Sequence, residues 1–375
     1  MRNAYFKRLI CLLMTAVLFA MLGISVSASE IGGISGKAAV LYEPESGSFL
    51  YKKSADVRMP MASTTKIMTA IVAMENSELS DVVTVDGRAV GTEGSSAYLS
   101  VGEELTMEEL LYALLLQSAN DAAVAIACHI GGDIDGFAEM MNAKALELGL
   151  TDTHFTNPHG LDDGEHYTTA GELAIIAAEL LKDPTLKRIV STYKKTFATD
   201  ERRRTYVNHN KLLKLYDGAI GVKTGFTKKC GRCLVGAAER DGLTLITVTL
   251  DAPDDWRDHA AMLDHGFEAV EKITLATPCD HLYEIAVTDG DADLLTVKNA
   301  VGLSRVLPRG EHKVEEYVKL SRFVTAPVNE GEILGRVVYT VDGEYVGEVP
   351  LVAEKSVTKT DDRSFMERLL SKIFG

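Results

Sequence analysis

The sequence predicts an α+β fold, in which helices pack against an antiparallel sheet, followed by a small all-β domain and a C-terminal amphipathic helix. Alternating apolar and polar residues at 37–53, and strand-like segments after Gly218, place strands at both ends of the first domain. From Pro60 onward the apolar residues recur at helical spacing, so a helical region separates the two groups of strands. Beyond Pro278 only short strand-like segments and turns follow, which predicts the second domain.

The predicted sheet is built from the two ends of the first domain. A hairpin at 37–53 turns at 44–47, where Pro, Ser and Gly interrupt the alternation. After Gly218 we expect three strands and a closing helix, at 219–224, 233–239, 243–250 and 255–272. Asp241 and Gly242 form a tight hairpin turn between the last two strands. Strands joined by such short turns run antiparallel.

The region between these strands is predicted to be helical. Pro60 suits a first helical turn, which puts Ser63 near a helix N-terminus. Thr106 and Glu109 have capping-box spacing ahead of a very apolar helix that stops at Gln117. Three more helices are expected, at 122–130 (ending at a Gly-Gly pair), 135–148 and 169–182.

Residues 1–28 are predicted to be a secretory signal peptide, cleaved after Ala28. Arg2, Lys7 and Arg8 precede an apolar run at 9–24, and small residues follow it. The run is shorter than the roughly 20 residues that a membrane span needs. We therefore expect the mature protein to work outside the cytoplasm.

Composition limits the classes of function. The chain has 375 residues, 46% of them hydrophobic, which is enough for a large core and more than one domain. Its formal net charge is −15, and it becomes −18 without the signal peptide, which holds three cations and no acids. This acidity argues against nucleic acid as a partner, because phosphate backbones are bound through clusters of Lys and Arg.

Five cysteines are present, of which four follow the signal peptide: Cys128, Cys230, Cys233 and Cys279. Cys230 and Cys233 have redox or half-zinc spacing, and export permits a disulfide. Because the chain has no second C-x-x-C, we expect a structural role, with Cys233 as a small core residue. The sequence leaves open whether the two sulfurs are bonded.

Three short motifs occur in one order and carry the functional prediction. They are Ser63-Thr64-Thr65-Lys66, Ser118-Ala119-Asn120 and Lys223-Thr224-Gly225. Each alone is weak, but the ordered set matches the S-x-x-K, S-x-N and K-T-G elements of penicillin-binding proteins and class A β-lactamases. The chain therefore resembles a serine acyl-transfer enzyme that acts on D-Ala-D-Ala peptides.

Ser63 and Lys66 are the expected nucleophile and base. Three residues apart on a helix, they face the same way. A Ser hydroxyl needs an adjacent base, and Lys66 can serve only when neutral, a state that burial and a second cation such as Lys223 favour. We expect Ser118 to relay a proton to the leaving amine and the Asn120 amide to hold the substrate carbonyl. Asn120 is alternatively a plain helix N-cap.

Lys223, Thr224 and Gly225 are expected on a strand that forms one wall of a cleft. An extended peptide can pair with such a strand through its backbone. Lys223 and Thr224 would then meet the terminal carboxylate, and Gly225 would permit close approach. The oxyanion of the tetrahedral intermediate needs backbone donors, and the Ser63 amide is one candidate.

Residues 37–277 resemble the low-molecular-mass penicillin-binding proteins, the serine-type D-alanyl-D-alanine carboxypeptidases. Family-like stretches surround the motifs at 59–70, 116–122 and 221–227, and a further one is 157–161. The resemblance implies removal of the terminal D-Ala from peptidoglycan stem pentapeptides through an acyl-enzyme on Ser63, in cell-wall maturation. It further implies covalent binding of penicillin and other β-lactams, an oxyanion contact from the Phe226 amide, and no cofactor or metal.

The resemblance also sets the expected domains: 1–28, the signal peptide; 29–276, the carboxypeptidase domain; 277–355, the all-β domain; and 356–375, a linker and anchor helix. On a helix, the tail at 361–375 has an apolar face and a charged face. Such a helix binds a membrane interface, which predicts a peripheral protein on the outer face of the cytoplasmic membrane. The alternative is a helix packed on the protein's own core.

Three other functions compete with this one. A class A β-lactamase has Ser-Asp-Asn as its middle motif and a separate Glu that activates water, and we find no counterpart to that Glu before Lys223. A non-catalytic wall-binding scaffold is disfavoured because every residue that the chemistry needs is present. A metallopeptidase is suggested by His154, His159 and His166, but the chain lacks H-E-x-x-H.

Overall fold

The structure, a computed structural model, describes residues 31–198 and 203–360. The signal peptide expected at 1–28 and the helix expected at 361–375 lie outside the described residues. The chain divides into two compact units, with the boundary between Glu271 and Lys272. Each unit has a hydrophobic core of its own.

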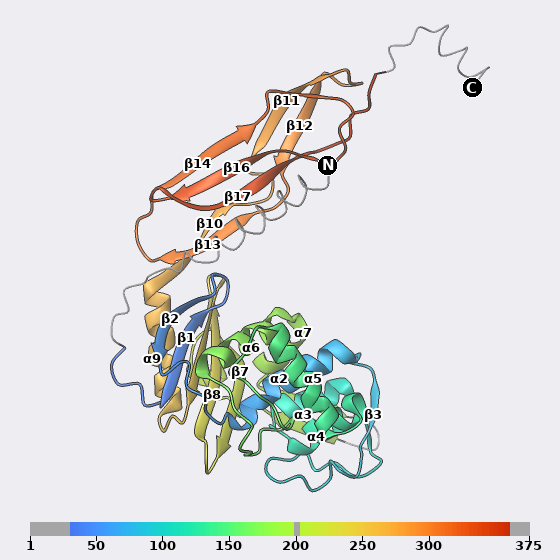
Figure 1. Cartoon of the computed structure of the whole chain (residues 1–375), viewed down its shortest axis with the longest axis vertical. Helices are drawn as coiled ribbons and strands as arrows, with labels where there is room; N and C mark the ends of the chain where they lie inside the picture. The colour runs from blue at the N-terminus through green and yellow to red at the C-terminus, as the bar shows by residue number, and fades with distance from the viewer. Residues whose placement is uncertain (1–30, 199–202, 361–375) are drawn as a thin grey trace, which may run out of the picture. The chain divides into compact units, whose positions relative to one another are not determined.

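The first unit contains the antiparallel sheet that the sequence predicts (Figure 1). The strand order is β2-β1-β9-β8-β7, and every neighbouring pair is antiparallel. The bounds are β1 Ala38–Glu43, β2 Ser48–Lys53, β7 Ala219–Thr227, β8 Gly231–Arg240 and β9 Leu243–Leu250. Strand β7, which carries the K-T-G motif, is therefore an edge strand of this sheet and is open to pairing with a further strand.

Helices cover both faces of this sheet. In Figure 1, α9 lies on one face, and α6 lies with the other helices on the opposite face; both contact β9. The bounds are α2 Lys66–Asn76, α3 Met107–Leu115, α4 Asn120–Gly131, α5 Ile134–Glu147, α6 Ala170–Lys182, α7 Pro184–Ser191, α8 Leu212–Leu215 and α9 Asp255–Ala269. The predicted capping box is confirmed: the Thr106 side chain accepts from the Glu109 amide, and the Glu109 side chain accepts from the Thr106 amide.

The structure differs from the sequence predictions in local detail. Ser63 lies in a short 3-10 turn, η2 (Ala62–Thr65), which leads into α2. Asn120 is the first residue of α4 rather than its N-cap, which is Ala119 without a side-chain bond. Two hairpin-like pairs were not predicted, namely β3 (Val82–Thr84) with β4 (Glu104–Thr106) and β5 (Lys194–Ala198) with β6 (Arg203–Val207).

The second unit is all-β, as predicted. It contains a six-stranded sheet in the order β14-β16-β17-β12-β11-β15 and a two-stranded sheet of β10 and β13. The bounds are β10 Val270–Ala276, β11 Leu282–Thr288, β12 Leu294–Asn299, β13 Leu303–Pro308, β14 Val314–Leu320, β15 Phe323–Thr325, β16 Ile333–Val341 and β17 Glu344–Ala353. Across the described parts of both units, we find no helix with the length and apolar character needed to cross a bilayer.

Candidate active site

The turn that carries Ser63 is packed tightly against β7. Ala62 has φ +48°, a left-handed conformation that is uncommon for a residue with a Cβ. A Cβ on Gly225 would lie 3.1 Å from the Ser63 amide nitrogen and 3.1 Å from the Met61 carbonyl oxygen. The absence of a side chain at Gly225 therefore lets the strand approach the turn, a contact that the sequence analysis did not predict.

Lys66 points back at the Ser63 hydroxyl. Its Nζ lies 2.9 Å from Ser63 Oγ, 2.6 Å from Asn120 Oδ1 and 2.5 Å from the His159 carbonyl oxygen, and it donates to all three. Lys66 is fully buried, at 0% exposure. All three of its bonding partners are uncharged, so no carboxylate among the described residues neutralises the ammonium form within hydrogen-bond distance.

This environment favours the neutral amine. Burial lowers the pKa of Lys66 well below its usual value, and the charge of Lys223 lowers it further, while Asp121 opposes the shift. Burial also lowers the pKa of Lys223, to about 7. A neutral Lys66 amine beside a serine hydroxyl has the lone pair that a general base requires.

Ser118 and Asn120 lie where α3 ends and α4 begins. Ser118 has φ +61° and lines the same pocket as Ser63. The Asn120 side chain accepts from Lys66 Nζ, and its Nδ2 donates to the Glu93 carbonyl oxygen at 2.5 Å. The simple N-cap interpretation of Asn120 is therefore wrong, because its side chain is used to hold Lys66 and the neighbouring loop.

The K-T-G strand presents alternate side chains to two sides. Thr224 and Phe226 line the pocket, whereas Lys223 is 1% exposed and donates to the Thr224 carbonyl oxygen at 2.9 Å. Phe226 pairs across the ladder with Arg232 of β8, so these two side chains share one face of the sheet. Phe226 is 66% exposed.

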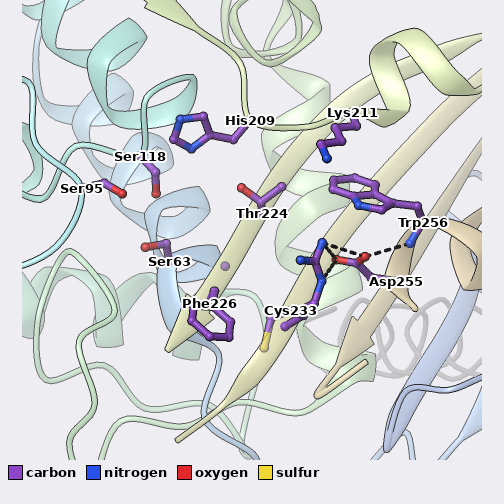
Figure 2. Close-up of a pocket in the computed structure, with 12 residues that line it drawn as sticks. Ser63, Ser95, Ser118, His209, Lys211, Thr224, Phe226, Cys233, Asp255 and Trp256 are labelled. Atoms are coloured by element: carbon purple, nitrogen blue, oxygen red, sulfur yellow. Dashed lines mark hydrogen bonds and ion pairs between the residues drawn. The ribbon is translucent and has the colours of Figure 1, made fainter. Parts of the chain in front are cut away.

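A pocket of about 340 Å³ joins these elements (Figure 2). It brings together Ser63, Ser118, Thr224, Gly225 and Phe226 from the predicted site. Its remaining lining residues are Ser95, His209, Lys211, Arg232, Cys233, Asp255 and Trp256. Lys66, Asn120 and Lys223 do not line it and contact the site from the protein interior.

The sequence analysis missed a cationic end of this pocket. Arg232 forms a bidentate pair with Asp255, at 3.1 Å from Nε and 2.9 Å from Nη2, and its guanidinium lies 5.8 Å from the Trp256 ring centre. Figure 2 shows Asp255 and Trp256 beyond Thr224, away from Ser63. Arg232 stands inside the C-G-R-C stretch, where no local pattern marks a ligand-binding residue. Only the pairing of β7 with β8 reveals its place.

The three histidines considered as metal ligands have separate roles. His154 Nδ1 bonds the Glu165 carbonyl, the His159 carbonyl accepts from Lys66, and the His166 ring bonds Thr65. Within 31–198 and 203–360, no group of three or more His, Cys, Asp or Glu side chains is arranged to hold a metal ion.

Cys230 and Cys233 are both buried thiols that are not joined by a disulfide. Cys230 Sγ donates to Asp162 Oδ1 at 3.0 Å, and Cys233 is 1% exposed. Burial raises the pKa of Cys230 to about 11 and that of Cys233 to about 12, so both are protonated at neutral pH. Both belong to the hydrophobic core of the first unit, and Cys233, opposite Gly225 in the β7–β8 ladder, also lines the pocket.

Comparisons with known proteins agree with this geometry. A family model described as D-alanyl-D-alanine carboxypeptidase matches residues 24–254, and one described as penicillin-binding protein 5, C-terminal domain, matches 271–359. The D-alanyl-D-alanine carboxypeptidase DacF of Bacillus subtilis is 32% identical over 381 aligned residues, covering 97% of this chain and 98% of the relative. DacC of Escherichia coli is 30% identical and covers 88% of this chain and 86% of its own length.

Solved structures agree as well. Penicillin-binding protein 5 from Haemophilus influenzae matches with a TM-score of 0.67 and 29% identity, over 87% of this chain and 98% of that protein. The Streptomyces K15 DD-transpeptidase matches at 36% identity and a TM-score of 0.60, over 63% of this chain and 98% of its own. By both family models and by full-length similarity, the chain belongs to the family of serine-type D-alanyl-D-alanine carboxypeptidases.

Proposed function

We propose that this chain removes the terminal D-Ala from peptidoglycan stem pentapeptides through an acyl-enzyme on Ser63, in the maturation of the cell wall. One observation carries the assignment of residues: the buried Lys66 amine lies 2.9 Å from Ser63 Oγ, and the partners to which it donates are all uncharged. A base of this kind is what a serine nucleophile needs. The names of the relatives supply the substrate class.

In the acylation step, Lys66 takes the proton of Ser63 as Oγ attacks the peptide carbonyl between the two D-Ala residues. The amides of Ser63 and Phe226 stabilise the oxyanion. Ser118, which lines the same pocket as Ser63, relays this proton from Lys66 to the amine of the leaving D-Ala. The Asn120 side chain holds Lys66, and its amide is proposed to hold the peptide carbonyl of the substrate. Water then releases the shortened peptide from Ser63.

The substrate's terminal carboxylate is proposed to bind at the cationic side of the pocket. Thr224 offers a hydroxyl there, and the buried Lys223 adds positive potential behind the strand. We add Arg232 to the predicted set, because Asp255 and Trp256 hold its guanidinium in one orientation at this end. An Arg held in place binds a carboxylate with little further loss of side-chain entropy.

β-Lactams are proposed to acylate the same serine. Mass spectrometry after brief exposure to a penicillin, with digestion to locate the adduct, should find a stable penicilloyl group on Ser63. Ser63→Ala should lose the adduct and D-Ala release by at least about 10³-fold, with its fold intact by circular dichroism. Ser95→Ala is the matched control, since Ser95 lines the same pocket but contacts Asn120 only through its backbone.

The other possible results of these experiments distinguish the alternative functions. Normal D-Ala release by Ser63→Ala refutes the mechanism. Rapid penicillin hydrolysis without a lasting adduct indicates a β-lactamase, and neither adduct nor hydrolysis indicates a non-catalytic scaffold. Full D-Ala release after exhaustive chelation excludes a metallopeptidase.

Export and membrane attachment are proposed from the sequence. The mature chain would begin at Ser29, with a catalytic domain to residue 276, an all-β domain to 355, and a tail whose residues 361–375 bind the outer face of the cytoplasmic membrane. Truncation after Ser356 should abolish binding to anionic vesicles, as measured by co-sedimentation, and leave turnover of a soluble peptide unchanged. Equal sedimentation of the full and truncated chains would contradict the membrane assignment.

A further inference from the structure

The peptide group between Ala62 and Ser63 must be held in one orientation for the proposed chemistry. Its N–H is the Ser63 amide, an oxyanion donor in the proposed function, and its C=O belongs to Ala62. Because a trans peptide is planar, its C=O and N–H point in opposite directions. Whatever fixes the Ala62 carbonyl therefore aims the Ser63 N–H. Since Ala62 has φ +48°, neighbouring contacts must stabilise this conformation.

A chain of hydrogen bonds ends on that carbonyl. Thr65 Oγ1 donates to the Ala62 oxygen at 2.8 Å and lies 2.7 Å from His166 Nε2. The other ring nitrogen, Nδ1, accepts from the Thr156 amide at 3.0 Å. The Thr65 hydroxyl is thus the group that connects the His166 ring to the Ala62 carbonyl.

The direction of each bond follows from the Thr156 amide, which can only donate. A neutral imidazole has one N–H and one acceptor nitrogen. Nδ1 accepts, so Nε2 carries the proton and donates to Thr65. The Thr65 hydroxyl receives that bond and keeps its own proton for the Ala62 carbonyl. The bonds therefore run in order from Thr156 through His166 and Thr65 to Ala62.

The chain is shielded from water and closely packed. His166 is 3% exposed and Thr65 is 1% exposed, and the His166 ring packs edge-on against Phe155 at 5.8 Å. A Cβ on Gly160 would lie 1.9 Å from the Ala62 oxygen, so the backbone of the adjoining loop also limits the movement of this carbonyl. Burial lowers the pKa of His166 to about 4, which keeps the ring in the neutral form at neutral pH.

We propose that His166 is a positioning residue that acts through the Thr65 hydroxyl to orient the Ser63 amide toward the oxyanion. It contacts neither the Ser63 hydroxyl nor Lys66, so its effect is on the stabilisation of the tetrahedral intermediate rather than on the base. The inference rests on the proposed function, since it needs Ser63 to be the acylated residue.

Two substitutions of His166 distinguish the contribution of its hydrogen bond to Thr156 from that of its hydrogen bond to Thr65. In His166→Asn, the amide oxygen can replace Nδ1 and accept from Thr156, but nothing reaches Thr65. In His166→Gln, the longer amide can replace Nε2–H and donate to Thr65. We expect His166→Asn to slow penicillin acylation of Ser63 by about 10-fold or more, approaching the 10²–10³-fold typical of losing one oxyanion donor. The rate of penicillin acylation in His166→Gln should stay within about threefold of that of the protein without substitutions, because the bond to Thr65 is kept.

The effect should fall on the transition state and not on initial binding. The acylation rate constant should drop while the dissociation constant of the non-covalent penicillin complex stays the same. A peptide boronic acid gives a second readout. Its boron forms a bond to Ser63 Oγ, the hydroxyl proton passes to Lys66, and one boronate oxygen occupies the oxyanion position. Its affinity should fall with His166→Asn in parallel with the acylation rate.

His259 is a matched control for the loss of a buried imidazole. It is fully buried in the same unit, and its two ring nitrogens bond Thr247 at 2.7 Å and Thr249 at 2.9 Å. Neither threonine contacts the Ser63 turn. His259→Asn should lower thermal stability and leave the acylation rate constant of the folded fraction unchanged.

Substitutions of Thr65 provide an independent test should the His166 variants fail to fold. Thr65→Val removes the hydroxyl and should slow acylation like His166→Asn, whereas Thr65→Ser keeps the hydroxyl and should restore it. Acylation at the original rate in His166→Asn or in Thr65→Val overturns the inference, as does an equal loss in the His259 control. If the protein without substitutions takes no penicilloyl group on Ser63, the proposed function itself is refuted. Failure of the proposed function is thereby distinguished from failure of the inference about His166.

Discussion

The interiors of the two units differ in polarity. Of the buried polar and charged residues that the structure describes, Asn299 alone belongs to the second unit. Its side chain has a structural role and bonds three backbone groups: Nδ2 donates to the carbonyl oxygens of Thr277 and Val301, and Oδ1 accepts from the His281 amide. The first unit instead buries lysines, histidines and acids, many of them around Ser63. Because burying such groups is costly, their concentration indicates where function has been selected over stability.

Two lysines in the first unit make the same distinction more sharply. Lys144 is 8% exposed and pairs with Glu75 at 2.6 Å and Glu147 at 2.9 Å. Burial alone would lower the pKa of Lys144, but the bonds to the two glutamates outweigh burial and raise it. Lys66 has no such partner, and its pKa falls. One lysine is a paired structural cation, and the other is the base of the proposed mechanism.

The largest effect that tests this distinction comes from replacing each lysine by Arg, which stays protonated in proteins. Lys66→Arg should lower acylation and D-Ala release by about 10³-fold or more, because a guanidinium cannot accept the Ser63 proton. Lys144→Arg should retain near-normal turnover, since a cation between two carboxylates is all that its position requires. Stopped-flow acylation with a chromogenic β-lactam measures both variants.

A Lys66→Arg variant that acylates at the original rate would show that Lys66 is not the base. A large loss in Lys144→Arg with a normal melting temperature would show that the two lysines are not distinguished by their partners.

A smaller, pH-dependent effect follows from the buried histidines of the first unit. Burial lowers the pKa of His159 to about 3, of His166 to about 4 and of His259 to about 3. Unfolded histidines titrate near about 6.5, so below that pH the unfolded chain binds protons that the folded unit excludes. The stabilisation is present above pH 6.5 and is lost as the pH falls toward 4, by about 1.4 kcal/mol per pH unit for each histidine.

Urea unfolding of the first unit at pH 7, 6 and 5, followed by the fluorescence of Trp256, should therefore show midpoints that fall with pH. His259→Gln should reduce the slope by the contribution of one histidine. A midpoint that is the same at pH 7 and pH 5 would mean that these imidazoles are not buried in the neutral form.

The strands of the five-stranded sheet and most helix positions could be predicted from the sequence, and Ser63 and Lys66 could be brought together, because each had a local pattern. Asp241-Gly242 marks a turn, Thr106 and Glu109 mark a cap, and Ser63 and Lys66 lie one helical turn apart. The expected strands 219–224 and 233–239 ended short of Phe226 and Arg232, and the register of β7 with β8 that brings these two residues opposite each other was not predicted. Register is set by long-range packing, which no short motif encodes.

The same limit explains why the N-cap alternative for Asn120 stayed open and why the contacts of His166 were not predicted. A polar residue at a helix start usually caps it, and only the fold brings Lys66 within 2.6 Å of the Asn120 side chain. His166 was considered as a metal ligand because residue type and spacing were the only available signals. Its bond to Thr65 joins residues 101 positions apart, and no local sequence pattern predicts it.

The smallest expected effect concerns the second unit. Every residue assigned to the pocket, from Ser63 to Trp256, precedes Glu271. The Streptomyces K15 DD-transpeptidase matches 63% of this chain with 98% of its own length, so a relative of about the size of the first unit folds alone. A chain ending at Glu271 should keep kcat/KM on a soluble D-Ala-D-Ala peptide within about twofold of the full chain, which corresponds to about 0.4 kcal/mol of transition-state stabilisation.

The matched control is the same truncation with Ser63→Ala, which should be inactive. A loss of 10-fold or more in a truncated chain with native circular dichroism would show that the second unit contributes to catalysis. The contrast between a polar, reactive interior and an apolar, structural one would then no longer separate the functions of the two units.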